Sequence, residues 1–100
     1  MKVLVTGANG FVGKALCPYL ASLGHDVVPA VRRPSGVCNE RIISDDASLK
    51  AALEGCDSVV HLAARAHVMH EQETDPLAVF RINNVDATLE LATRAVETGV

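Results

Sequence analysis

Residues 6–13 read TGANGFVG, and their glycines stand at Gly7, Gly10 and Gly13, directly after a short apolar run. In a strand-to-helix turn, glycines at such spacing can allow a sharp bend, a close approach of a pyrophosphate, and tight packing of helix against strand. The N-terminus of the following helix directs unpaired N–H groups and a positive dipole end toward the same point. The stretch therefore predicts a nucleotide-binding turn. A purely structural turn is the alternative.

Around this turn, short apolar runs alternate with segments of helical periodicity. Strands are expected at residues 2–6, 26–31, 41–43 and 58–62. Helices are expected at residues 11–23, from Asp45 or Asp46 to Gly55, and from Asp75 and Pro76 to Gly99. The order β-α-β-β-α-β-α predicts one α/β domain over residues 1–100, a Rossmann-like doubly wound parallel sheet with helices on both faces in three layers.

Three local features need explanation by the structure. Pro18 lies inside the first expected helix and predicts a kink or local distortion, because it removes a main-chain N–H. Pro29 lies inside the second expected strand, where the sequence offers no account of it. An apolar stripe predicts one face of the last helix, formed by Ala78, Ile82, Val85, Leu89, Ala92 and Val96.

Composition and charge argue against several classes of function. The net charge is −3 and no basic stripe is present, which argues against binding of nucleic acid. No apolar run approaches the roughly 20 residues that cross a bilayer, and the run at Val3–Val5 is too short for a signal peptide. The three widely spaced cysteines are expected to be reduced thiols of a cytoplasmic protein. His67, His70, Glu71 and Glu73 lack a second cluster of ligands, so no metal site is expected.

Several motifs together resemble a known family. TGANGFVG has the T-G-x-x-G-x-x-G form of extended short-chain dehydrogenases/reductases. HLAA at residues 61–64 agrees with it, and AARAHVMHE at residues 63–71 favours the UDP-glucose 4-epimerase-like branch of the family. NNVDATLELA at residues 83–92 is close to the family's N-V-x-G-T pattern, with Ala87 in place of its glycine. Over its whole length the chain resembles the NAD-dependent epimerases/dehydratases of nucleotide sugars, the UDP-glucose 4-epimerase-like proteins.

The resemblance implies a set of cofactor-binding residues. Phe11 and Val12 would offer N–H groups to the pyrophosphate, and Asp45 and Asp46 would meet the adenine, although they could also simply cap the following helix. Leu62 to Arg65 would line the wall near the pyrophosphate and the nicotinamide ribose. Asn84 would brace the pocket, or serve as a hydrogen-bonded structural amide. The full expected set is Gly7, Asn9, Gly10, Phe11, Val12, Gly13, Arg32, Arg33, Asp45, Asp46, Leu62, Ala63, Ala64, Arg65 and Asn84.

The corner after the second expected strand indicates which dinucleotide is preferred. An NAD enzyme usually places Asp or Glu there, where the carboxylate binds the ribose 2′-hydroxyl. Here the corner carries Arg32 and Arg33, and guanidinium groups suit a 2′-phosphate. NADP is therefore predicted over NAD. The alternative is that both arginines are solvated and NAD is held by main-chain contacts.

The family's chemistry is hydride transfer supported by a Tyr-x-x-x-Lys pair. The one tyrosine of this chain, Tyr19, is followed four residues later by Leu23, so no catalytic residue is assigned. The resemblance implies the NAD(P)-binding N-terminal portion of a nucleotide-sugar epimerase, dehydratase or reductase, inactive by itself, and it also allows for a homodimer. Two alternatives stay open: a non-catalytic NAD(P)-sensing module and a structural α/β module without a ligand.

Overall fold

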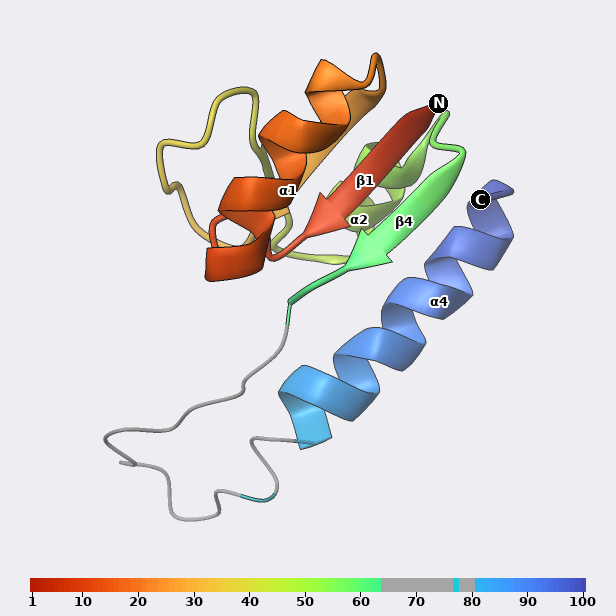
Figure 1. Cartoon of the computed structure of the whole chain (residues 1–100). Coiled ribbons are helices and arrows are strands. Elements are labelled where there is room, and N and C mark those ends of the chain that lie inside the picture. Colours follow the sequence, from red (N-terminus) through yellow and green to blue (C-terminus); the bar gives the residue numbers. More distant parts are fainter. Residues whose placement is uncertain (64–76, 78–80) are drawn as a thin grey trace.

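The structure, a computed structural model, describes residues 1–63, 77 and 81–100 (Figure 1). Its strands are β1 (Lys2–Thr6), β2 (Asp26–Val31), β3 (Arg41–Ile42) and β4 (Ser58–His61). Its helices are α1 (Phe11–Ser22), α2 (Asp46–Leu53), a π-helical segment η1 (Arg81–Asp86) and α4 (Ala87–Thr98). The elements expected up to residue 62 are all present with closely similar bounds. The helix start expected at Asp75 and Pro76 lies outside the described residues.

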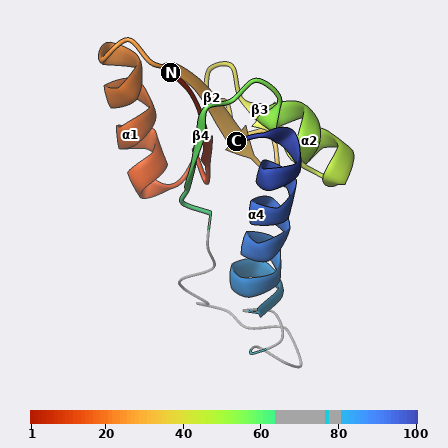
Figure 2. The ribbon, with the colours of Figure 1, turned by 90° about the vertical axis from the view of Figure 1, so that its right-hand side faces the viewer.

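The four strands form one parallel sheet in the order β3-β2-β1-β4. Because successive side chains of a strand point to opposite faces, β1 supplies both sides of the sheet. Val3 and Val5 pack toward Cys17 of α1, and Leu4 packs toward Leu53 of α2. Figure 2 shows α1 on one face of the sheet and α2 and α4 on the other. The predicted Rossmann-like three-layer architecture is confirmed.

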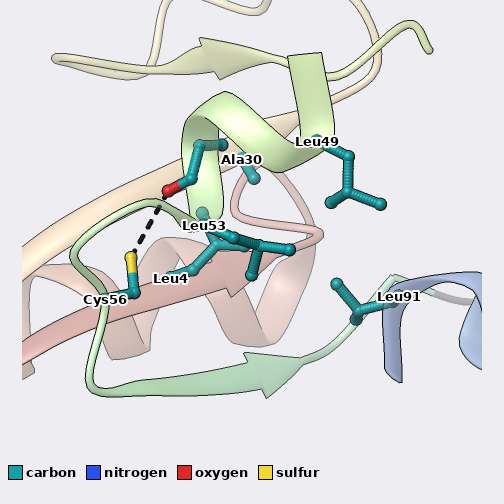
Figure 3. Close-up of a cluster of buried hydrophobic side chains, with 7 residues drawn as sticks. Leu4, Ala30, Leu49, Leu53, Cys56 and Leu91 are labelled. Carbon is teal, nitrogen blue, oxygen red and sulfur yellow. Dashed lines mark hydrogen bonds between the residues drawn. The ribbon is translucent and has the colours of Figure 1, made fainter. Parts of the chain in front are cut away.

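The core between the sheet, α2 and α4 is built from aliphatic side chains of modest size (Figure 3). Leu4 and Leu53 are fully buried at its centre, and Leu91 reaches in from α4. The Cys56 thiol is buried beside them and donates a hydrogen bond to the carbonyl of Ala52 at 3.3 Å. Burial raises the pKa of this thiol. Cys56 thus acts as a small core residue that satisfies its own polar group.

The direction of main-chain groups in β2 explains Pro29. The carbonyl of Ala30 accepts a hydrogen bond from Ala8, on the β1 side, whereas the carbonyl of Val31 accepts one from Ile43, on the β3 side. Since these directions alternate along a strand, the nitrogen of Pro29 faces the β3 side. There the ladder begins only at Arg41, opposite Ala30. No ladder hydrogen bond is lost at Pro29, so a proline is tolerated in this strand.

Pro18 does not end the first helix. α1 continues through Pro18 to Ser22, where the Ser22 hydroxyl donates to the carbonyl of Tyr19 at 2.6 Å. The side chain of Cys17, next to Pro18, is buried against the sheet. Packing of this face therefore maintains the helix across the lost hydrogen bond.

The face of α4 that meets the sheet differs from its apolar stripe. Leu91 is buried and Ala95 packs beside it, whereas Leu89 and Val96 are 61% and 77% exposed. Ile82 and Val85 are also exposed, and Ala78 lies outside the described residues. Within the part of the chain that the structure describes, no helix is both long enough and apolar enough to cross a membrane.

Candidate functional site

A cleft of about 980 Å³ opens where the parallel strands end. Residues that follow β1 line it together with residues that follow β2 and β3, and the end of β4 completes the wall. The edge beyond the carboxyl ends of parallel strands is where α/β sheets bind ligands. The cleft is lined by Thr6, Gly7, Asn9, Gly10, Ala30, Val31, Arg32, Arg33, Ile43, Ser44, Asp45, Asp46, Leu49, His61, Leu62, Ala63, Ala87, Glu90 and Leu91.

The cleft brings together many of the residues predicted from the sequence. Gly7, Asn9, Gly10, Arg32, Arg33, Asp45, Asp46, Leu62 and Ala63 all line it. Phe11, Val12, Gly13 and Asn84 are not part of its lining. Ala64, Arg65 and the histidine-containing stretch at residues 67–73 lie outside the described residues. Within the described ones, no group of three or more His, Cys, Asp or Glu side chains could hold a metal ion.

The three glycines of the turn meet different surroundings. Gly7 has a φ of 65°, and a Cβ added to it would lie 2.7 Å from the nitrogen of Ala63. A Cβ on Gly13 would lie 2.7 Å from the Cα of Ala8 and would also overlap the carbonyl oxygen of Gly7. A Cβ on Gly10 would meet only that carbonyl oxygen, at 3.2 Å. Gly7 and Gly13 are therefore required by the fold, whereas Gly10 leaves space on the side of the cleft.

The first turn of α1 begins beside the cleft, directly after the lining residue Gly10. Its N-cap is Gly10, which has no side chain to bond the first N–H groups, and the first turn holds no acidic residue. Phe11 and Val12 follow with exposed side chains. A helix N-terminus of this kind attracts an anion through its N–H groups and its dipole. The contribution of the Phe11 and Val12 N–H groups to a pyrophosphate site, which the resemblance implies, stays a prediction.

The two aspartates after β3 have separate environments. Asp45 caps α2: its carboxylate accepts a hydrogen bond from the Ser48 N–H at 2.8 Å, and the Ser48 hydroxyl accepts one from the Asp45 N–H at 3.0 Å. This hydrogen bonding to Ser48 lowers the pKa of Asp45. Asp46 faces Glu90 of α4 instead, and a hydrogen bond to Glu90 raises the pKa of Asp46. Asp45 therefore caps α2, a role that can coexist with contact to the adenine.

A chain of hydrogen bonds between β1, β4 and α4 was missed by the sequence analysis. Thr6 Oγ1 lies 2.6 Å from His61 Nδ1, and His61 Nε2 lies 3.0 Å from Thr88 Oγ1. The Thr88 hydroxyl in turn donates to the carbonyl of Asn84 at 2.7 Å. Thr6 and His61 occupy paired positions of β1 and β4. Only the strand register brings them together, so the order of residues alone gives no signal of their contact.

Comparison with known proteins agrees with this geometry. A family model described as the NAD dependent epimerase/dehydratase family matches residues 3–100. UDP-glucose 4-epimerase of Vibrio cholerae is 36% identical over 104 residues, which cover 98% of this chain and 32% of the relative.

Solved structures of similar proteins contain nicotinamide dinucleotides. MoeE5 in complex with UDP-glucose and NAD has a TM-score of 0.79 and 36% identity, covering 100% of this chain and 34% of that one. Human epimerase family protein SDR39U1 with NADPH has a TM-score of 0.73 and 28% identity, covering 94% and 31%. The chain thus spans about a third of the length of these relatives. This chain belongs to the NAD dependent epimerase/dehydratase family.

Proposed function

We propose that this chain binds a nicotinamide dinucleotide in the cleft at the carboxyl ends of its strands. The observation that carries the proposal is Gly10, whose missing side chain leaves main-chain groups open to the cleft. The pyrophosphate would lie over Gly10 and the first N–H groups of α1. Leu62 and Ala63 would face it from the segment directly after β4, and Ala64 and Arg65 are proposed to belong to the same wall. Asp45 and Asp46 would meet the adenine from the start of α2, and Asn84 would brace the pocket from η1.

The chemistry that the cofactor supplies is hydride transfer at the nicotinamide ring. Relatives with UDP-glucose bound and relatives named as epimerases support a nucleotide sugar as the substrate of the whole protein. Thus these residues would form the cofactor-binding portion of a nucleotide-sugar epimerase, dehydratase or reductase. Tyr19 stands outside any Tyr-x-x-x-Lys pair, so this portion contributes binding and orientation of the cofactor. A homodimer of the whole protein belongs to the same proposal.

NADP is the proposed preference. Arg32 and Arg33 line the cleft directly after Val31, the last residue of β2. This is the corner where the adenine ribose lies in dinucleotide-binding sheets. A guanidinium offers paired donors to a 2′-phosphate and keeps its charge. The neighbouring structure of SDR39U1 contains NADPH, whereas that of MoeE5 contains NAD.

Calorimetric titration of the protein with NAD and with NADP tests both proposals. Binding of either cofactor is expected, with NMR shifts concentrated at Gly7–Gly13; no binding would contradict the proposed function. Replacing Arg32 and Arg33 by alanine together should weaken NADP by roughly 1.5–3 kcal/mol, the cost of a charge-assisted hydrogen bond, and leave NAD nearly unchanged. Equal affinities in the parent, or equal losses for both cofactors, would contradict only the NADP preference.

A further inference from the structure

We propose that His61 is a positioning residue which, as a neutral imidazole with its proton on Nε2, fastens the glycine turn after β1 to the first turn of α4. The inference rests on the proposed function in so far as this turn holds the dinucleotide. The side chains of Thr6, His61 and Thr88, joined in this order by hydrogen bonds, form a unit that we name the histidine clamp.

The directions of the hydrogen bonds fix the tautomer of His61. The Thr88 hydroxyl has one hydrogen, which it donates to the carbonyl of Asn84 at 2.7 Å. Its oxygen must then accept at 3.0 Å from Nε2–H of His61. In a neutral imidazole the other nitrogen is an acceptor, so Thr6 donates its hydroxyl hydrogen to Nδ1 at 2.6 Å.

The same hydroxyl of Thr6 also holds the end of β4. Thr6 Oγ1 accepts hydrogen bonds from the N–H groups of Leu62 at 3.1 Å and Ala63 at 3.2 Å. Its two lone pairs accept these two bonds, and its own hydrogen is left to be donated to His61. Every donor and acceptor of the clamp is therefore matched in one arrangement, and that arrangement requires the neutral Nε2–H form.

This arrangement sets the width of the cleft at its phosphate side. Gly7 lies so near Ala63 that even a Cβ would overlap its nitrogen. Thr6 therefore determines how the glycine turn and the end of β4 are spaced. On the other side of the clamp, Ala87 lines the cleft next to Thr88. His61 thus couples two walls of the cleft to each other.

The surroundings of His61 favour the neutral form. Thr6 of β1 and Thr88 of α4, its hydrogen-bond partners, are uncharged. Within the described residues, the charged group that acts on it is Arg32, after β2. Burial and, secondarily, the positive charge of Arg32 both lower the pKa of His61. Protonation of His61 would place an N–H on Nδ1, opposite the Thr6 hydroxyl. The Thr6 hydroxyl could then no longer donate a hydrogen bond to Nδ1. The spacing of turn and strand would then lose its support.

A series of threonine variants tests the clamp. Thr88→Val keeps the shape of the side chain and removes the acceptor of Nε2–H, so the dissociation constant for NAD should rise roughly 3- to 10-fold, as for one lost hydrogen bond. Thr88→Ser restores the hydroxyl and should bind NAD like the parent. Thr93→Val is the matched control, since Thr93 is an exposed residue of α4 whose hydroxyl also donates four residues back, to Leu89 at 2.8 Å.

Two NMR readouts test the clamp without any cofactor. Long-range ¹H–¹⁵N spectra should show His61 as the Nε2–H tautomer in the parent. Amide exchange of Leu62 and Ala63 should accelerate in Thr88→Val and not in Thr93→Val. An Nδ1–H tautomer, or identical exchange and identical NAD affinity in Thr88→Val and parent, would overturn the proposal. If the parent binds neither NAD nor NADP, the proposed function fails, whereas the tautomer and the amide exchange still decide whether the clamp exists.

Discussion

The three glycines of the turn can be separated one residue at a time. Gly10→Val should fold, because a Cβ there meets only the Gly7 carbonyl, and it should abolish NAD binding by filling the cleft. Gly13→Val should instead lower the free energy of unfolding by about 1–3 kcal/mol or more, because its Cβ overlaps main-chain atoms of Ala8. Thermal unfolding and calorimetric titration of both variants measure these effects.

Gly10→Ala is the graded control of this pair, since it adds the Cβ alone. If Gly10→Val bound NAD like the parent, the turn would be structural and the cleft would hold its ligand elsewhere. If Gly13→Val unfolded at the parent's temperature, the close approach of α1 to the turn would not contribute to stability.

At the scale of single residues, the sequence predicts where the backbone needs a particular residue better than it predicts which side chains contact one another. The positive φ of Gly7 and the tight packing at Gly13 could be predicted, because a turn between strand and helix imposes them locally, whereas the approach of Gly7 to Ala63 could not. Asp45 could be predicted as a cap for the same reason. The contact of His61 with Thr6 could not, because it depends on the pairing of strands that are far apart in sequence.

At the scale of elements, an ion-pair network joins α2 and α4. Arg94 Nε lies 2.9 Å from Glu90 Oε1 and 4.0 Å from Asp46 Oδ2, and Arg94 also pairs with Glu97. Hydrogen bonds to Glu90 and Glu97 raise the pKa of Arg94 and keep it charged. Arg94→Met retains the apolar stem but removes the charge, so it should lower the melting temperature. It should also accelerate amide exchange in α4.

Lys50→Met is the control for this network. The Lys50–Glu97 pair also joins the two helices, at 3.7 Å, yet both side chains are about half exposed. Such a pair contributes little to stability. Lys50→Met should therefore unfold like the parent. An equal decrease of the melting temperature in both variants would mean that net charge, rather than the position of Arg94, stabilises the contact between α2 and α4.

The presence of these helices and strands could be predicted from the sequence, because the spacing of apolar residues that is typical of each is a local property. The sequence could not predict which face of α4 packs on the sheet. The stripe with Leu89 and Val96 is exposed, whereas Leu91 and Ala95 meet the core. Both faces are apolar, and only the position of α4 beside α2 selects between them. Pro29 is a similar case, since its tolerance depends on where β3 begins.

At the scale of the whole molecule, His61 should make stability depend on pH. In an unfolded chain a histidine has a pKa of about 6.5, and in the folded protein the pKa of His61 is lower. Between these values the unfolded state binds a proton that the folded state does not. The free energy of unfolding should therefore decrease as the pH falls from about 6.5 through the folded pKa, and should gain nothing further from this group at higher pH.

Denaturant unfolding between about pH 5 and pH 8 measures this dependence, over the range where histidine titrates. His61→Gln removes the titrating group, so its stability should change less with pH than that of the parent. Other histidines contribute equally to both proteins and cancel in the comparison. Parallel curves for the two proteins would contradict a lowered pKa of His61.

The overall architecture could be predicted because alternating strands and helices, joined by right-handed crossovers, leave few arrangements of a parallel sheet. The cleft follows from the same rule, since all strands end at one edge. The arrangement of the side chains that line the cleft does not follow from this rule. The placement of Glu90 opposite Asp46, for example, requires the packing of α4 on α2 to be known.

The position of β1 between β2 and β4 has a consequence for protein synthesis. β1 leaves the ribosome before either of its two neighbours in the sheet, and β4 ends only at His61. Until then Val3, Leu4 and Val5, all buried in the folded protein, have no complete sheet to join. The nascent chain thus carries an apolar segment without a partner for dozens of residues, a segment suited to transient binding by a chaperone.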